Sequence, residues 1–135
     1  FRVEDLERIE REAERLPTVN QIELHPRFQQ AELRAWHAAH GIATEAWSPL
    51  AQGDVLEDGT IETIAAHHAR SPAQAILRWH LQLGNVAIPK SATPERIREN
   101  FEVFDFELSE DDMAAIQRLD AGQRIGGDPS TFDLD

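Results

Sequence analysis

The chain of 135 residues contains no cysteine, no tyrosine and only one methionine. Without cysteine it can form neither a disulfide nor a thiolate-bound metal centre. No apolar run approaches the roughly 20 residues that a membrane helix needs. The opening segment also lacks the basic region and the apolar stretch of a signal peptide. We therefore expect a soluble, cytoplasmic protein that does not enter a membrane.

Positive charge is also scarce, since 13 Lys and Arg face 25 Asp and Glu for a formal net charge of −12. Nucleic acids and anionic membranes attract basic surfaces, so neither is an expected partner. The hydrophobic content of 41% suffices for one domain with a core. The chain starts with Phe1 rather than Met, which together with the missing tyrosine suggests a fragment of a longer protein.

Hydrophobic periodicity predicts alternating helices and strands. Caps formed by Ser, Thr, Pro and Gly mark several helix ends, and the tail from Ala121 is predicted to be loose. The predicted helices are 6–16, a segment around 33–36 that ends at Gly41, 61–65, 71–84, 93–101 and 109–119, and the predicted strands are 18–24, 42–48 and 85–89.

This alternation favours parallel strands joined by crossover helices. A closed barrel of this kind needs about eight strands and some 250 residues. The chain is therefore either less than half of a barrel or a small open sheet, and periodicity alone does not choose between them.

The segment 88–100 leaves the third predicted strand and enters a helix, with Lys90, Ser91 and Arg96 around the helix start. Unpaired backbone N–H groups and two cations there would suit a phosphate group. Alternatively, Ser91 or Thr93 only caps the helix and the cations are solvated. Barrel phosphate sites lie after the last two strands, which favours the phosphate interpretation if the chain ends a barrel.

Other catalytic or metal-binding patterns find little support. His37 and His40 could share a helix face and His67 adjoins His68, but no acidic partner stands at ligand spacing, so no metal site is expected. His25, before a proline at a strand end, is expected to structure the turn. The Gly-x-Ser-x-Gly, Walker and Gly-x-Gly-x-x-Gly motifs are missing from the sequence.

Three segments in order resemble the aldo-keto reductase family, in particular the C-terminal half of its bacterial 2,5-diketo-gluconate-reductase-like members. They are VNQIELHP at 19–26, EAWSPLAQG at 45–53 and IPKSATPERIREN at 88–100, and Phe1 fits the end of the family's SNF strand. The resemblance covers nearly the whole chain. It implies an α/β fold, the C-terminal portion of a (β/α)8 TIM barrel with about three βα units and a terminal helix. Residues 1–135 would form one partial barrel.

The resemblance assigns the nicotinamide end of an NADPH cofactor to two side chains. Gln21 would bind the carboxamide and Trp47 would stack on the ring, although Trp47 could instead be a core residue. Trp36 and Trp79 are expected to be core or helix-packing residues. The pyrophosphate would be bordered by Ser48, Leu50, Gln52 and Gly53.

The same resemblance places the adenosine end on the segment 88–100. Lys90, Ser91 and Arg96 would bind the ribose 2′-phosphate, which favours NADPH over NADH. Glu99 and Asn100 would face the adenine.

The family's catalytic Asp, Tyr, Lys and His belong to the N-terminal half, and a chain without tyrosine cannot supply the proton donor. The resemblance therefore implies an NADPH-dependent reductase of small aldehydes or ketones, of which this chain is the cofactor-binding half, inactive alone and completed by a missing N-terminal half. The alternative is a non-catalytic half-barrel that binds NADPH or associates with itself through its exposed strand edges.

Overall fold

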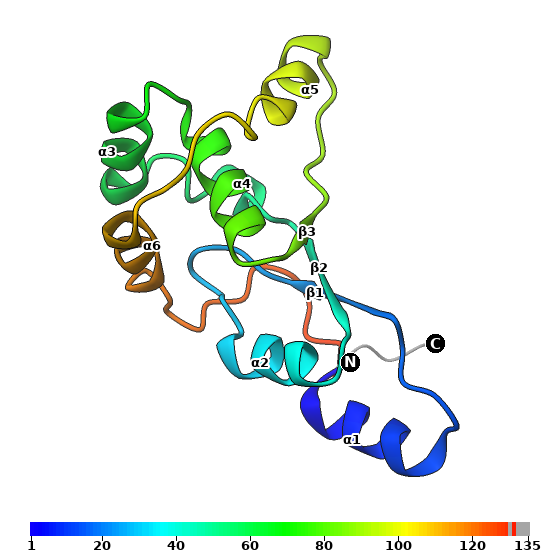
Figure 1. Cartoon of the computed structure of the whole chain (residues 1–135). Helices are drawn as coiled ribbons and strands as arrows, with labels where there is room; N and C mark the ends of the chain where they lie inside the picture. The colour runs from blue at the N-terminus through cyan, green and yellow to red at the C-terminus, as the bar shows by residue number, and fades with distance from the viewer. Residues whose placement is uncertain (130, 132–135) are drawn as a thin grey trace.

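A computed structural model describes residues 1–129 and residue 131, and it consists of parallel strands covered by helices (Figure 1). Strand and helix alternate as predicted for most of the chain, and the first and last elements are helices. The helices are α1 (Val3–Glu12), α2 (Ala31–Ala39), α3 (Gly59–His67), α4 (Pro72–Gln82), α5 (Pro94–Phe101) and α6 (Glu110–Gln117), with a short 3-10 turn η1 (Ala51–Gly53); the strands are β1 (Val19–Glu23), β2 (Ala43–Trp47) and β3 (Val86–Ala87).

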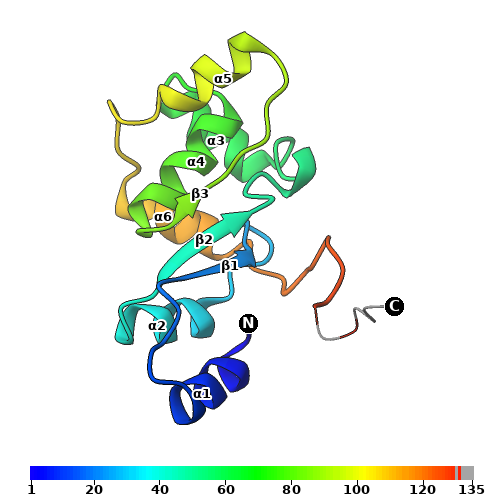
Figure 2. The same cartoon turned by 90° about the vertical axis from the view of Figure 1, so that its right-hand side faces the viewer.

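The strands form a three-stranded parallel sheet in the order β1-β2-β3. Glu23 and Trp47, the last residues of β1 and β2, are partners in the register. The carboxyl ends of the strands therefore meet at one edge, where open α/β sheets bind ligands. Figure 2 shows the three strands side by side between the helices α3, α4 and α5 and the helix α1.

Helices cover one face of the sheet, and most of the other face is open. Side chains alternate between faces along a strand, and Asn20 and Ile22 of β1 and Thr44 and Ala46 of β2 are buried on the face that the helices cover. The side chain of Val19 belongs to the opposite set and is 46% exposed. Among the described residues, the tail covers that second face only at the carboxyl ends of β1 and β2, where Glu23 is buried.

The core lies between the covered face and the helices α2, α3, α4 and α6. Its fully buried side chains include Ile61, Ile76, Trp79 and Ile116, and Trp36 packs at its margin. The predictions for Trp79 and Trp36 are therefore confirmed. Capping boxes at Ser71 and Ser109 begin α4 and α6 where the sequence predicted.

Some predicted boundaries are wrong. α1 ends at Glu12 instead of reaching Leu16, since Glu10, Glu12 and Glu14 stand at the negative end of the helix dipole. The third strand has two residues rather than five, because its partner β2 ends at Trp47 and Ser48, with a φ of +48°, leaves the extended conformation. In α6 only Ile116 is buried, while Met113 and Leu119 are half-buried and Leu119 lies beyond the helix.

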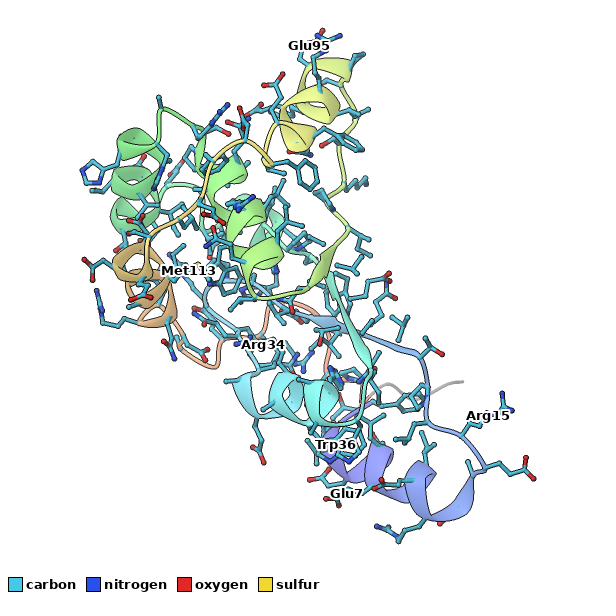
Figure 3. The ribbon with its side chains drawn as sticks, viewed as in Figure 1. Glu7, Arg15, Arg34, Trp36, Glu95 and Met113 are labelled. Carbon is cyan, nitrogen blue, oxygen red and sulfur yellow. The ribbon has the colours of Figure 1, made fainter. Side chains whose placement is uncertain are left out.

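Helices α1 and α5 lie at opposite ends of the molecule. Figure 3 places Glu7 and Arg15 on and next to α1 at one end of the molecule and Glu95 on α5 at the other. On α5, Ile97 and Phe101 are 47% and 71% exposed, so the packing face predicted for this helix has no partner among the described residues. None of the described helices combines the length and the apolar character that would let it cross a bilayer.

The tail was predicted to be loose from Ala121, and this is wrong for its described first part. The N–H groups of Ala121 and Gln123 donate to the carbonyl of Arg27, at 3.1 and 3.0 Å. Those of Ile125 and Gly126 donate to a side chain of β1 described below. Residues 130 and 132–135, which belong to the same predicted tail, lie outside the described residues.

Candidate functional site

A groove of about 740 Å³ opens where β2 and β3 end, between their following loops and the first turns of α4 and α5. The loops after two neighbouring parallel strands leave the same sheet edge, which is why residues far apart in sequence meet there. The predicted site residues that line it are Ser48, Leu50, Gln52, Gly53, Lys90, Ser91, Arg96, Glu99 and Asn100.

The loop after β2 forms one wall of this groove in an unusual backbone conformation. Ser48, Ala51 and Gln52 have φ values of +48°, +47° and +56°, and Gly53 has +100°. Non-glycine residues rarely adopt positive φ, and such residues cluster at functional sites. The turn is fixed by hydrogen bonds from Ala51 N to Ser48 O, 2.9 Å, and from Gly53 N to Leu50 O, 2.8 Å.

The opposite wall carries the groove's cations. Lys90 and Arg96 are exposed, and within the described part of the chain neither forms an ion pair. Arg27, Arg70 and Arg78, by contrast, are each bound to an aspartate or glutamate. The groove therefore holds two positive charges that are available to an anion.

The hydroxyls near the start of α5 do not cap it. Thr93 occupies the N-cap position without a capping hydrogen bond from its side chain. The hydroxyl of Ser91 instead accepts a hydrogen bond from the amide of Asn100, at 2.8 Å. The structure thus leaves the first turn of α5 without the side-chain cap that the simpler interpretation required.

Gln21 and Trp47 lie apart from this groove, in a second cavity of about 450 Å³. Its other walls include Glu23 of β1, Gln30 and Arg124 of the tail. Trp47 and Ser48 are consecutive, so the end of β2 is where the two cavities adjoin. Trp47 is half-buried at this edge, which leaves part of its surface accessible.

Two buried histidines form hydrogen bonds with residues next to the two cavities. Burial lowers the pKa of His80 to about 3, and its Nε2 lies 3.2 Å from the carbonyl oxygen of Pro49 in the loop after β2. Burial likewise lowers the pKa of His25, whose Nε2 lies 3.2 Å from Glu23 Oε1. Both rings are therefore neutral near pH 7 and act as hydrogen-bonding braces. His25 also closes the predicted turn through backbone hydrogen bonds with Phe28.

Sequence reasoning missed parts of both cavities. Ser71, Pro72 and Ala73, at the start of α4, line the first groove. Their signal was present, since a capped helix that follows the second strand of an α/β unit begins at the ligand-binding edge. Arg124 had no such signal, because only tertiary contacts bring it to β1. Among the described residues, no cluster of His, Asp and Glu could hold a metal ion.

Comparison with known proteins gives a consistent result. The model of the Aldo/keto reductase family matches residues 1–121. An aldo-keto reductase of Mycobacterium sp. (strain KMS) is 59% identical over 88% of the chain and 43% of its own length. Methylglyoxal reductase DkgA of Yersinia pestis is 53% identical over 100% of the chain and 50% of its own length.

The solved structure of a Gox0644 mutant in complex with NADPH superposes with a TM-score of 0.95 at 51% identity, covering 99% of the chain and 50% of Gox0644. The chain thus spans about half the length of the relatives it matches. The predicted fold class, a portion of a (β/α)8 barrel, is confirmed. The chain belongs to the aldo/keto reductase family.

Proposed function

We propose that this chain is the cofactor-binding, C-terminal half of an NADPH-dependent reductase that converts small aldehydes or ketones to alcohols. The observation that carries the proposal is the pair of cations, Lys90 and Arg96, that lack an ion-pair partner among the described residues and lie at the groove beyond the strand ends. In a chain of net charge −12, two available cations in one groove favour a ligand with an extra phosphate.

The residues of the two cavities fit the parts of NADPH. Lys90 and Arg96 would pair with the ribose 2′-phosphate, and Ser91, held by Asn100, would present its hydroxyl to the same group. The pyrophosphate would lie along the loop 48–53. Gln21 would hydrogen-bond the carboxamide while Trp47 presents a flat apolar surface to the ring. Glu99 and Asn100 would lie beside the adenine.

When bound, NADPH supplies the hydride that reduces a carbonyl carbon. The proton for the carbonyl oxygen needs a general acid, and this chain contains no tyrosine to provide it. We therefore assign the chain cofactor binding and orientation, and assign proton transfer to an N-terminal half. The relatives named as methylglyoxal reductase support a small carbonyl compound as the substrate class.

A second candidate is a half-barrel that binds NADPH and associates with itself without turnover. It is favoured by the sheet face that the helices leave open, where the side chains of Val19 and Val86 are 46% and 47% exposed. Strands β1 and β3 also form the two edges of the sheet, and unpaired edges promote association.

The test is a calorimetric titration of the 135-residue chain with NADPH and with NADH. The wild-type chain should bind NADPH more tightly. Arg96→Ala should weaken NADPH by about tenfold or more, as expected for a lost charge-assisted hydrogen bond, and change NADH by less than about threefold. Sedimentation of the same samples distinguishes a monomer from the self-associating form.

Arg98→Ala is the matched control, because Arg98 lies on the same helix, is exposed and does not line the groove. It removes the same charge and should leave both affinities unchanged. An equal loss for NADPH and NADH in Arg96→Ala would contradict the 2′-phosphate assignment. A wild-type chain that binds neither nucleotide would contradict the proposed function.

A further inference from the structure

The side chain of Glu23 is a fully buried carboxylate at the carboxyl end of β1, and four groups on described residues lie within hydrogen-bonding distance of its oxygens. Its Oε1 accepts from the N–H of Ile125 at 2.6 Å and faces His25 Nε2 at 3.2 Å. Its Oε2 accepts from the N–H of Gly126 at 3.1 Å and from Arg124 Nη1 at 3.2 Å. A buried charge is tolerated when it is paired and hydrogen-bonded in this way.

These donors belong mainly to the tail, at a sequence separation of about 100 residues. Arg124 contributes a second anchor, because its guanidinium lies over the Phe28 ring at 4.7 Å from the centroid. Glu23 therefore fastens the segment Arg124–Gly126 across the strand ends and beside the second cavity.

The fastened segment leaves no space at the outer edge of the Trp47 ring. A Cβ placed on Gly126 would lie 2.2 Å from Trp47 Cη2 and 2.9 Å from Glu23 Oε2. The backbone of Gly126 thus touches the outer edge of the indole ring, while Glu23 and Trp47 are neighbours in the sheet register. One carboxylate consequently determines both the tail's path and the edge against which Trp47 rests.

We propose that Glu23 is a positioning residue, whose carboxylate clamps Arg124–Gly126 against Trp47 and so fixes the ring that receives the nicotinamide end of the cofactor. This inference rests on the proposed function, which supplies the identity of the ligand. It goes beyond that function by naming Glu23 as the residue that orders the nicotinamide end of the site. His25 completes the clamp, since its neutral ring donates the Nε2 proton to Glu23 while buried Nδ1 has no partner among the described residues.

The test is Glu23→Gln in the 135-residue chain, with adenosine 2′,5′-bisphosphate and NADPH as probes. A Gln amide would turn an NH₂ group toward the tail's N–H donors, so the clamp should open with little change in volume. NADPH affinity should fall on the order of tenfold and amide exchange at Ile125 and Gly126 should rise at least about tenfold. Affinity for adenosine 2′,5′-bisphosphate should stay unchanged, because that probe needs only the first groove.

Gly126→Ala changes the tail side of the same contact, so it tests the inference even if Glu23→Gln fails to fold. Its added methyl group should displace the tail from Trp47, change the Trp47 fluorescence and reproduce the selective loss of NADPH. Glu107→Gln, at a side chain that is 81% exposed, and Gly59→Ala, where a Cβ meets nothing within 4 Å, are the matched controls.

Unchanged NADPH affinity together with unchanged exchange in either folded variant would overturn the inference. A wild-type chain that binds neither probe would instead overturn the proposed function. In that case exchange at Ile125 and Gly126 and Trp47 fluorescence still report whether Glu23 holds the tail.

Discussion

The two cavities at the strand ends differ in whether their charged side chains are paired. In the groove beyond β2 and β3, Lys90 and Arg96 have no ion-pair partner within the described part of the chain. In the cavity beside β1, the Glu23 carboxylate is buried and is bonded by the tail on both of its oxygens.

The first groove therefore determines the affinity for a ligand, and the second cavity determines the geometry of the backbone around it. An unpaired, exposed cation contributes little to folding and is available to a ligand's phosphate. A fully bonded buried carboxylate has no capacity left for a ligand, but it fixes the backbone that surrounds it. Substitutions in the first groove should therefore change ligand affinity. Substitutions of the buried groups, such as Glu23, His25 and His80, should change stability and geometry.

Acidification should produce the largest effect on stability, because a neutral histidine is buried next to each cavity and must take up a proton at low pH. The pKa of His80 is about 3 in the folded chain and about 6.5 when unfolded, so the unfolded chain binds more protons between these values. Stability is full above pH 6.5 and decreases as the pH falls toward 3. His80 alone should cost about 2 kcal/mol at pH 5, and the lowered pKa values of His25 and His37 act in the same direction.

Urea unfolding at pH 7, 6 and 5 measures this effect. The variant His80→Gln, which keeps a donor for the Pro49 carbonyl, should show a weaker dependence on pH. A free energy of unfolding that stays constant from pH 7 to 5 would show that these rings are not held neutral by burial.

Gly53→Ala should have the next largest effect, since its φ of +100° is a conformation that L side chains rarely adopt. We expect a loss of about 1 kcal/mol in the free energy of unfolding. Gly59→Ala is the matched control, because its Cβ meets nothing and its φ is ordinary, and it should change stability by less than about 0.5 kcal/mol. Equal urea midpoints for the two variants would mean that the loop after β2 is not constrained.

Arg27→Met should have the smallest effect, although Arg27 contacts both the segment after β2 and the tail. Its side chain pairs with Asp54 at 2.7 Å and with Asp58 at 3.6 Å; Asp54 is 58% exposed, so the lost pairs should together cost less than about 1 kcal/mol. Its carbonyl oxygen, which the variant retains, accepts the N–H groups of Ala121 and Gln123. Amide exchange at these two residues should stay slow; a rapid increase would show that the side chain, not the backbone, holds the tail.

Much of this protein was predictable from local patterns. Ser71 with Pro72 and Ser109 with its acidic first turn predicted the starts of α4 and α6, because capping depends on neighbouring residues alone. Alternating strands and helices predicted the parallel sheet. The site residues after β2 and β3 were grouped by the resemblance to the family, and the structure brings them together in one groove.

What the sequence by itself determined is therefore the order of the elements, the parallel sheet and the family. Only the tertiary structure decided which charges are paired and which are available. It joined Glu23 to Arg124 and Gly126 across about 100 residues and exposed Phe101. Within residues 1–129 and 131, it also left Lys90 and Arg96 without an ion pair. The physical reason is that burial and ion pairing depend on distances in space, which spacing along the chain does not encode once the partners lie on different elements.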